Sequence, residues 1–215
     1  MGVIRYLGAF IFILIGYYSL TTIGISTYSL VLFSFGVIPI LELVIPPSAS
    51  LNEPKSVKAY TIVLYAIVPL YFGLLIYFLI IIGQETNTLT LVGKITAMGM
   101  LHGIFGINMA HELGHRKSKL DQFLAQLLLW SSQYTHFFIE HNRGHHKRVA
   151  TLEDPATARK DETIFNFWKR SVRDSFISAW KLENDAQIRE NKAVFRWNND
   201  MVKYMVYQTA LIVVI

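Results

Sequence analysis

Residues 89–116 read LTLVGKITAMGMLHGIFGINMAHELGHR. Up to Ala110 this stretch carries one charged residue, Lys94, and it is as long as a helix that crosses a bilayer, which needs about 20 apolar residues. It runs straight into His111 and His115, which lie four residues apart. Because residues four apart lie on one face of a helix, both imidazoles face the same side. The stretch therefore predicts a membrane-spanning helix that ends in a pair of potential metal ligands.

The composition of the whole chain agrees with a membrane location. Its 215 residues are 53% hydrophobic and 16% charged, and the mean hydropathy is +0.37. Soluble domains are about 45–50% apolar and about 25% charged, so the excess indicates an integral membrane protein. The chain has no cysteine, which excludes a disulfide framework, a thiolate zinc site, an iron–sulfur cluster and a cysteine nucleophile.

Four apolar stretches are long enough to cross the membrane, and turn-forming residues separate them. We therefore expect an all-α fold in which residues 1–110 form a bundle of four transmembrane helices. In the last of them, Gly99 and Gly103 form a GxxxG pair, which is typical of close helix packing. The four stretches are 3–20, 28–45, 60–82 and 89–110.

Positive charge is concentrated in the second half of the chain. Up to His115 there are four basic and four acidic residues, so the net charge of +5 belongs to the residues that follow. The first and third connections between apolar stretches contain no Lys or Arg, whereas the amino terminus (Arg5) and the second connection do. By the positive-inside rule, the amino terminus and the histidines face the cytoplasm. We expect the membrane to be a bacterial inner membrane. Residues 111–200 are thus predicted to be a cytoplasmic, histidine-rich helical layer, and they contain no nucleic-acid-binding motif.

Two further apolar segments are interrupted or short. Residues 120–139 are broken by Ser131-Ser132-Gln133, and the sequence leaves open a re-entrant or interfacial hairpin and an additional tilted span. Residues 204–215 cannot cross a hydrocarbon core of about 30 Å at about 1.5 Å per residue. We expect them to begin a further transmembrane helix, so that the chain is an amino-terminal fragment of a longer protein.

A second histidine cluster follows at residues 140–146, which read EHNRGHH. Together the two clusters hold five imidazoles, and neutral imidazole suits zinc, copper, iron and nickel. The first cluster also reads HExxH, the zinc metalloprotease signature, in which Glu112 would be the general base. A protease zinc needs only one ligand beyond the two motif histidines. Five imidazoles exceed one tetrahedral zinc and favour two metal ions.

Three strings of residues resemble a known family. HELGHR at 111–116, EHNRGHH at 140–146 and ATLEDPA at 150–156 resemble the integral-membrane alkane 1-monooxygenases. These enzymes belong to a histidine-box superfamily together with xylene monooxygenases and fatty-acid desaturases. The chain departs from the family pattern at Arg116, where Lys is usual, and at Leu152, where Pro is common. The family's third histidine box would lie beyond residue 215.

The resemblance implies a non-haem diiron monooxygenase that hydroxylates the terminal methyl group of medium- or long-chain alkanes with O₂. The diiron centre itself would be catalytic, and this fragment alone is expected to be inactive. With no haem, flavin or iron–sulfur cluster in the chain, electrons would come from a rubredoxin-type donor and its reductase. A desaturase-like oxidase remains the alternative, distinguished by alkene rather than alcohol products. By resemblance the iron ligands are His111, His115, His141, His145 and His146.

Other polar residues near the clusters are expected to support the ligands. Glu112 and Glu140 would accept the outer N–H of a ligand imidazole and so fix its orientation. Asn108 lies on the same helix face as His111 and is a candidate for the same task. His136 would orient a ligand or line the path of the apolar substrate. His102 is about half a turn out of phase with His111, which favours a packing role.

Overall fold

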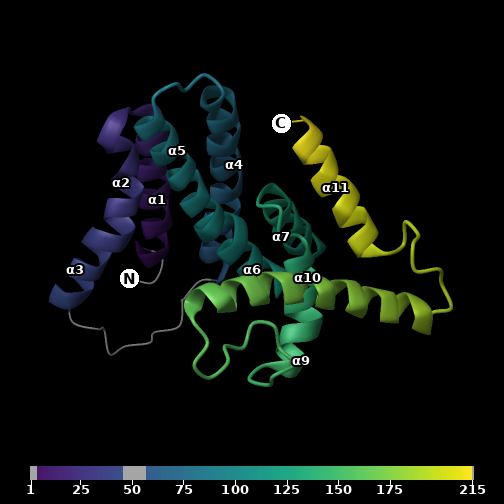
Figure 1. Ribbon diagram of the computed structural model, residues 1–215. Helices are drawn as coiled ribbons and strands as arrows, with labels where there is room; N and C mark the ends of the chain where they lie inside the picture. Colours follow the sequence, from purple (N-terminus) through teal and green to yellow (C-terminus); the bar gives the residue numbers. More distant parts are fainter. Residues whose placement is uncertain (1–3, 46–56, 215) are drawn as a thin grey trace. The chain divides into compact units, whose positions relative to one another are not determined.

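The computed structural model describes residues 4–45 and 57–214. Every regular element in these residues is a helix, so the all-α prediction is confirmed. The chain divides into two units, Met1–Met109 and Ala110–Ile215, each with its own helices (Figure 1). This division lies beside the predicted boundary between residues 1–110 and 111–200, although the placement of the second unit in the cytoplasm stays a prediction.

The first unit is built from helices whose side chains are mainly apolar. Helix α1 packs against α4 and α5. Between α1 and α4 lies one continuous helical run, made of η1 (Gly24–Tyr28), α2 (Ser29–Leu32), the π-helix η2 (Phe33–Val37) and α3 (Ile38–Val44). The other elements are α1 (Ile4–Thr21), α4 (Val57–Ile82), α5 (Thr88–Leu101) and the π-helix η3 (His102–Asn108).

Three helical runs are long and apolar enough to cross a membrane: Gly24–Val44, Lys58–Ile82 and Thr88–Gly114. They agree with the second, third and fourth predicted stretches, and the chain is an integral membrane protein. The apolar helix Gly8–Thr21 is shorter than these runs, so the first predicted span stays a prediction. Residue 3, the connection at 46–56 and residue 215 lie outside the described residues.

The first break between helices is tighter than predicted. Helix α1 ends at Thr21 and the next helical element begins at Gly24, four residues before the predicted start. Gly24 has φ +63°, in the left-handed region that glycine enters without a steric cost. Its N–H donates to the Thr90 hydroxyl at 2.9 Å, which fixes the turn against α5.

The close packing of α5 occurs near Gly93 rather than at the predicted GxxxG pair. A Cβ at Gly99 or Gly103 would meet no atom within 4 Å, so that prediction is wrong for the described residues. A Cβ at Gly93 would collide with the Thr27 side chain. The closest packing against α5 therefore occurs where η1 crosses it. A GxxxG spacing does not identify that position.

Two polar pairs in the first unit give partners to two ionisable residues of its helices, Lys94 and His102. Lys94, which is nearly buried, contacts the Glu85 carboxylate at 2.9 Å. The Tyr71 hydroxyl and His102 Nδ1 lie 2.5 Å apart, and Tyr71 is fully buried. Polar groups at membrane depth need such partners. His102 thus packs against α4, as its phase predicts.

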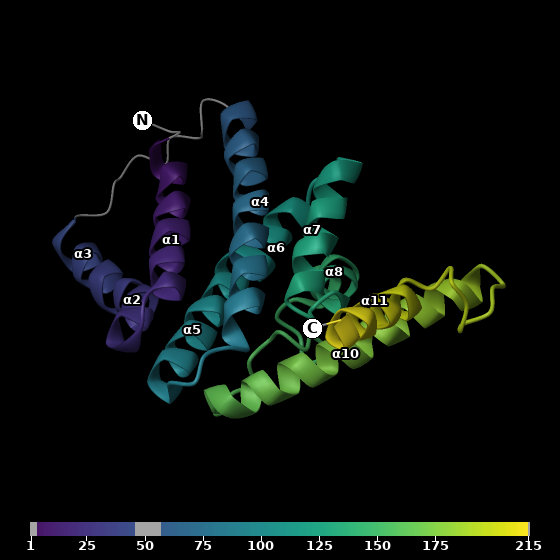
Figure 2. The ribbon, with the colours of Figure 1, turned by 90° about the horizontal axis from the view of Figure 1, so that it is seen from above.

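The second unit places a bent histidine segment on a long helix. The segment runs through α8 (His136–Ile139), the π-helix η4 (Glu140–His145) and α9 (His146–Arg148). Helix α10 (Ile164–Arg189) packs against α8 and η4 and is a single straight helix in both views (Figures 1 and 2). The remaining elements are α6 (Met109–Gly114), α7 (Lys119–Ser131) and α11 (Asp200–Val214).

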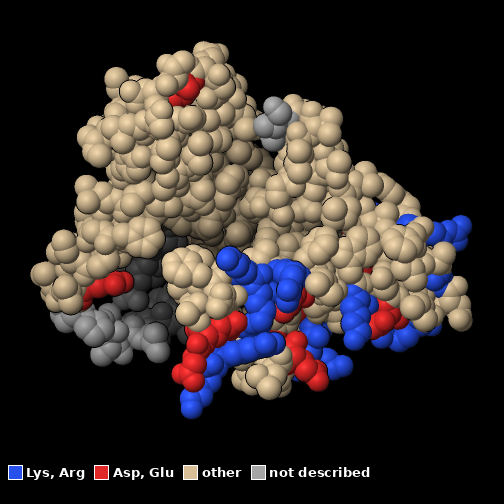
Figure 3. All heavy atoms as spheres, viewed as in Figure 1, with Lys and Arg blue, Asp and Glu red and all other residues tan. Residues whose placement is uncertain are grey.

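The core of this unit lies where the histidine segment, α10 and α11 meet. Its fully buried members are Ile139, Ala179, Met201 and Tyr204, with Phe176, Trp180 and Leu182 packed against them. Helix α7 packs against α8 and α11. Each of these helices buries only one face, so α10 keeps a charged face. Lys, Arg, Asp and Glu gather over α9 and α10 (Figure 3).

Residues 120–139, which the sequence left open, are not one helix. Helix α7 ends at Ser131, and Gln133 turns the chain with φ +56° before α8 begins. The 13 residues of α7 are about 20 Å long, which is shorter than the hydrocarbon core. A helix–turn–helix thus replaces a continuous span, and its depth in the membrane stays a prediction.

Candidate metal centre

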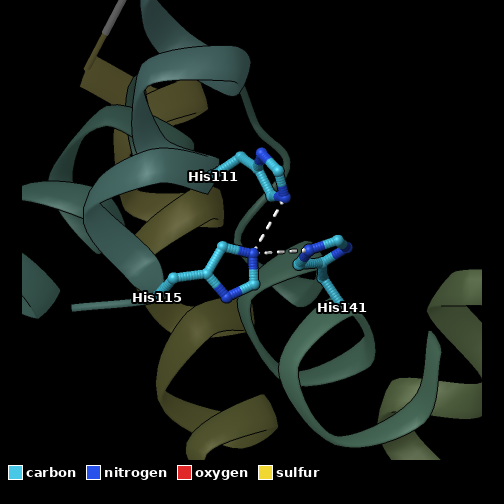
Figure 4. Close-up of side chains that lie close together, drawn as sticks. All are labelled: His111, His115 and His141. Atoms are coloured by element: carbon cyan, nitrogen blue, oxygen red, sulfur yellow. Dashed lines mark hydrogen bonds between the residues drawn. The ribbon is translucent and has the colours of Figure 1, made fainter. Parts of the chain in front are cut away.

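Four imidazoles of the second unit form a chain of close contacts, and the nitrogens of His111, His115 and His141 all lie within 4.8 Å of one another. His111 lies in α6 and His115 directly follows it, whereas His141 and His146 lie in the histidine segment. The Nε2 atoms of His111 and His115 are 2.9 Å apart, those of His115 and His141 are 3.0 Å apart, and those of His141 and His146 are 3.1 Å apart. Figure 4 shows three of these rings pointing their nitrogens toward one another.

These contacts cannot all be hydrogen bonds. A ring nitrogen has one site in the ring plane, which is a donor when the nitrogen carries a proton and an acceptor when it does not. Nε2 of His115 contacts two other ring nitrogens, and so does Nε2 of His141. At least one contact at each of these atoms is therefore left without a proton between the nitrogens. Such crowding of lone pairs is the arrangement that a cation requires.

The spacing of the nitrogens also fits a metal ion. Imidazole nitrogens bind first-row divalent ions at about 2.1 Å, the value for zinc. Two ligands at right angles would then be separated by about 3.0 Å, and two ligands at the tetrahedral angle by about 3.4 Å. The observed 2.9–3.1 Å agrees with ligands at right angles, as in octahedral or square-based coordination. The donor set therefore fits the metal that the sequence predicts.

The π-helical turn of η4 explains why His146 joins the cluster. In an α-helix His146 would be rotated well away from His141, because residues four apart align. A π-helix has i→i+5 hydrogen bonds, which bring residues five apart onto one face. His141 and His145 still stack, with ring centroids 5.2 Å apart. All three imidazoles of the second cluster can thus face one region.

His145 is held by a buried carboxylate that the sequence analysis missed. Its Nδ1 lies 2.9 Å from Asp154 Oδ2, and Asp154 is 1% exposed. The Thr157 hydroxyl and the Ala156 N–H also donate to this carboxylate, at 2.6 and 3.0 Å. With Nδ1 donating to Asp154, Nε2 of His145 keeps its lone pair for a metal. The sequence did contain a signal for this contact, because the EDPA run places an acidic residue nine positions after His145.

The charge states of these groups suit metal binding. Burial raises the pKa of Asp154, but hydrogen bonds from Thr157, Ala156 and His145 outweigh burial, and the net pKa is lowered. Burial lowers the pKa of His141 to about 3, assisted by the neighbouring imidazoles, and it lowers that of His115 as well. Both imidazoles are therefore neutral at pH 7, which is the form that binds metals.

The two glutamates that were predicted to orient ligand imidazoles each contact an arginine. Glu140 contacts Arg148 at 2.9 Å, and Glu112 contacts Arg116 at 3.1 Å. Among the described residues neither carboxylate is hydrogen-bonded to an imidazole. The predicted role of both glutamates as holders of ligand rings stays a prediction. So does that of Asn108, which is exposed at the end of η3.

His136 is separate from the cluster. It is 5% exposed, and its ring packs edge-on against Tyr134 and Phe176. Burial lowers its pKa to about 4, and its Nε2 has no hydrogen-bond partner among the described residues. The next residue, Phe137, stacks on His141 with centroids 4.7 Å apart. The predicted role of His136, orienting a ligand or lining the path of the substrate, stays a prediction.

Comparison with known proteins identifies the family. The family model described as fatty acid desaturase matches residues 86–215, which include both histidine clusters. The chain belongs to the fatty acid desaturase family. The histidine-box resemblance seen in the sequence is thus confirmed.

Curated relatives within this family carry more specific names. The chain is 33% identical to the alkane 1-monooxygenase of Ectopseudomonas oleovorans over 196 residues, which are 87% of the chain and 49% of that protein. It is 34% identical to alkane 1-monooxygenase 1 of Alcanivorax borkumensis over 208 residues, which are 92% of the chain and 51% of that protein. It is 26% identical to a xylene/toluene monooxygenase hydroxylase component of Pseudomonas putida over 184 residues, 83% of the chain and 49% of that protein. The chain therefore spans about half the length of these desaturase-family relatives.

Proposed function

We propose that the chain is the amino-terminal part of a membrane alkane monooxygenase that hydroxylates the terminal methyl group of medium- or long-chain alkanes. The observation that carries the proposal is the set of four converging Nε2 atoms, which cannot satisfy one another by hydrogen bonds. The named relatives support the reaction class, because two of those compared are alkane 1-monooxygenases.

Non-haem iron is the metal that this donor set would hold. His111, His115, His141 and His146 supply the converging nitrogens, and His145 supplies a fifth that Asp154 orients. Five imidazoles exceed what one tetrahedral ion takes, which supports two iron ions, with further ligands from the remainder of the protein. When bound, the iron would supply the activation of O₂. The residues of this chain keep the imidazoles neutral, fix their direction and pack Phe137 against His141.

The substrate and the electron donor follow from the surroundings of the site. His111 lies near the end of the membrane-spanning run Thr88–Gly114 and His115 directly follows it, so an apolar chain end in the bilayer has a short path to them. The chain has no cysteine, so the electrons come from a partner, which we propose is a rubredoxin-type protein supplied by its reductase. The charge of +5 beyond His115 suits an acidic partner and the cytoplasmic side of the membrane.

The zinc protease alternative is not favoured by the geometry. Its general base would be Glu112, which contacts Arg116 rather than the converging nitrogens. The fourth nitrogen, from His146, is also not needed by a protease zinc with two motif histidines and one further ligand. The desaturase alternative uses the same ligands, and only the product distinguishes it.

The proposal is tested with the full-length protein in membranes, supplied with iron, a rubredoxin, its reductase and octane. We expect iron in the purified protein and 1-octanol among the products, measured by metal analysis and gas chromatography. His115→Ala should lose both, because His115 contacts two other ligand nitrogens. His102→Gln, which keeps a polar group beside Tyr71, is the matched control and should retain the iron.

Two outcomes would contradict the proposal. An alkene in place of the alcohol would show a desaturase. Zinc without iron, together with peptide cleavage that is lost in Glu112→Gln while the metal is retained, would show a protease.

A further inference from the structure

The histidine segment carries a second regular pattern besides its histidines. Arg143 follows His141 by two residues, and Arg148 follows His146 by two residues. Two residues correspond to roughly half a turn of a helix, whether α or π. The arginines therefore project from the face opposite the imidazoles. On that face lies α10, which packs against η4.

Arg143 fastens this face to the middle of α10. Its Nη1 donates to Glu183 Oε2 at 2.6 Å, and its Nη2 donates to the Leu182 carbonyl at 3.1 Å. Glu183 is 4% exposed, and its other oxygen accepts from the Gln187 side chain at 3.1 Å and the Asp200 N–H at 3.3 Å. The carboxylate that receives Arg143 is thus itself held from α10 and α11.

Arg148 makes a second attachment one π-turn further along. Its Nη2 donates to Glu140 Oε1 at 2.9 Å and to the Ser178 hydroxyl on α10 at 2.7 Å. Its Nε reaches the Gly144 carbonyl at 3.4 Å. A Cβ at Gly144 would collide with both the Glu140 carboxylate and the Arg148 guanidinium. Glycine at this position is therefore required by the ion pair that crosses it.

We propose that Arg143 and Arg148 are positioning residues that set the direction of His141, His145 and His146 by fixing the histidine segment to α10. Two attachments five residues apart fix both the rotation of the segment about its axis and its shift along α10. Loss of either attachment frees a rotation, and a rotation moves the Nε2 atoms away from those of α6. The inference rests on the proposed metal site, since it concerns how that site is held in place.

The variants Arg143→Gln and Arg148→Gln test this arrangement in the full-length protein, with Co²⁺ as the probe. We expect each to weaken Co²⁺ binding by about 10- to 100-fold, the range found when residues that orient metal ligands are removed. At saturating Co²⁺ the visible absorption bands should also shift, because the angles between the ligands change. Arg173→Gln is the matched control, because Arg173 is exposed and contacts only its neighbour Asp174 among the described residues.

Further variants separate positioning from folding. Glu183→Gln should weaken Co²⁺ binding as Arg143→Gln does, and the loss in the double variant should be smaller than the sum of the two single losses, because the two residues share the contact between them. Arg148→Lys keeps the charge but not the forked geometry, so it should restore part of the affinity. The thermal unfolding of each metal-free variant is measured in parallel by circular dichroism.

The outcomes separate this inference from the proposed function. If the wild-type protein binds no Co²⁺ or iron, the metal site itself is wrong. If the wild type binds and both arginine variants bind with the same affinity and the same absorption bands, the positioning role is wrong. If a variant binds Co²⁺ more weakly only in proportion to its unfolded fraction, and its absorption bands are unchanged, the positioning role is also wrong. The arginines would then support the fold alone.

Discussion

At the scale of single residues, one oxygen of Asp154 takes two hydrogen bonds at once. It accepts from His145 Nδ1 at 2.9 Å and from the Thr157 hydroxyl at 2.6 Å. The carboxylate is buried, so these bonds are little screened by water. Asp154, in the loop that follows the histidine segment, thus determines that Nδ1 of His145 carries the proton. The lone pair of His145 is therefore on Nε2.

Asp154→Asn tests this role. Asparagine keeps the size and one acceptor oxygen but removes the negative charge that holds the imidazole proton. We expect iron or Co²⁺ to bind about 10- to 100-fold more weakly, measured by titration of the purified protein. Glu153→Gln is the matched control, since Glu153 is exposed and makes no ion pair among the described residues. Equal affinities in the two variants would contradict the role of Asp154.

Two glycines of the histidine boxes allow a matched comparison. A Cβ at Gly144 would collide with Glu140 and Arg148, whereas a Cβ at Gly114 would lie 3.5 Å from Phe138, an ordinary contact. We expect Gly144→Ala to weaken Co²⁺ binding to an extent similar to Arg148→Gln, and Gly114→Ala to change it little. The same titration measures both, and a larger loss for Gly114→Ala would show that the crowding at Gly144 is unimportant.

At the scale of elements, α10 also holds the loop that carries Asp154. Arg170 binds Glu162 with two bonds of 2.7 Å and reaches the carbonyls of Pro155 and Thr157 at 3.2 and 2.9 Å. These bonds fix the middle and the end of the loop to the first turns of the helix. Because Asp154 immediately precedes Pro155, the contacts of Arg170 also limit where the Asp154 carboxylate can lie.

The Glu162 contact predicts a dependence of stability on pH. Hydrogen bonds from Arg170, joined by the backbone of Arg159, lower the pKa of Glu162 from 4.5 to about 2. A lowered pKa means that the stabilisation is complete above pH 4.5 and is lost as the pH falls toward 2. We expect the unfolding temperature of Glu162→Gln to change less over this range than that of the wild type. Parallel curves for the two proteins would contradict the contribution of this pair, and Glu153→Gln serves as the control.

The elements differ in how well the sequence predicted them. The apolar spans were predictable, because burial in lipid requires long runs of apolar residues that can be read directly. The π-helical turn of η4 was not, because an i→i+5 turn carries no residue signature of its own. The sequence names His146 as a ligand only by resemblance, while the structure brings its Nε2 to 3.1 Å from that of His141. The contact of Asp154 with His145 depends on the path of a loop, which spacing alone does not define.

At the scale of the whole molecule, charge and apolar surface are divided between the two units. The first unit contains the membrane-spanning runs, and the chain beyond His115 contains the whole net charge of +5. This division makes the sidedness of the membrane testable, because these 215 residues contain no cysteine. A single thiol introduced among them is then unique within the chain.

Thr86→Cys and Lys181→Cys provide the two labels. Both positions are exposed, one in the turn between α4 and α5 and one on α10. The positive-inside rule places the turn outside and α10 in the cytoplasm. A maleimide that cannot cross membranes should therefore label Thr86→Cys in intact cells and Lys181→Cys only after the cells are opened. The reverse pattern would contradict the predicted topology.

The convergence of imidazoles from α6 and from the histidine segment has a consequence for how the protein is assembled. His115 and His141 are 26 residues apart in the chain, so a cation bound by both is a cross-link that closes the intervening loop. Such a link removes conformational freedom from the unfolded chain, and the free energy of metal binding becomes free energy of folding. We expect the proposed metal to stabilise the folded chain as well as to take part in the reaction, and amide exchange in α6, α7 and η4 should slow together when it binds.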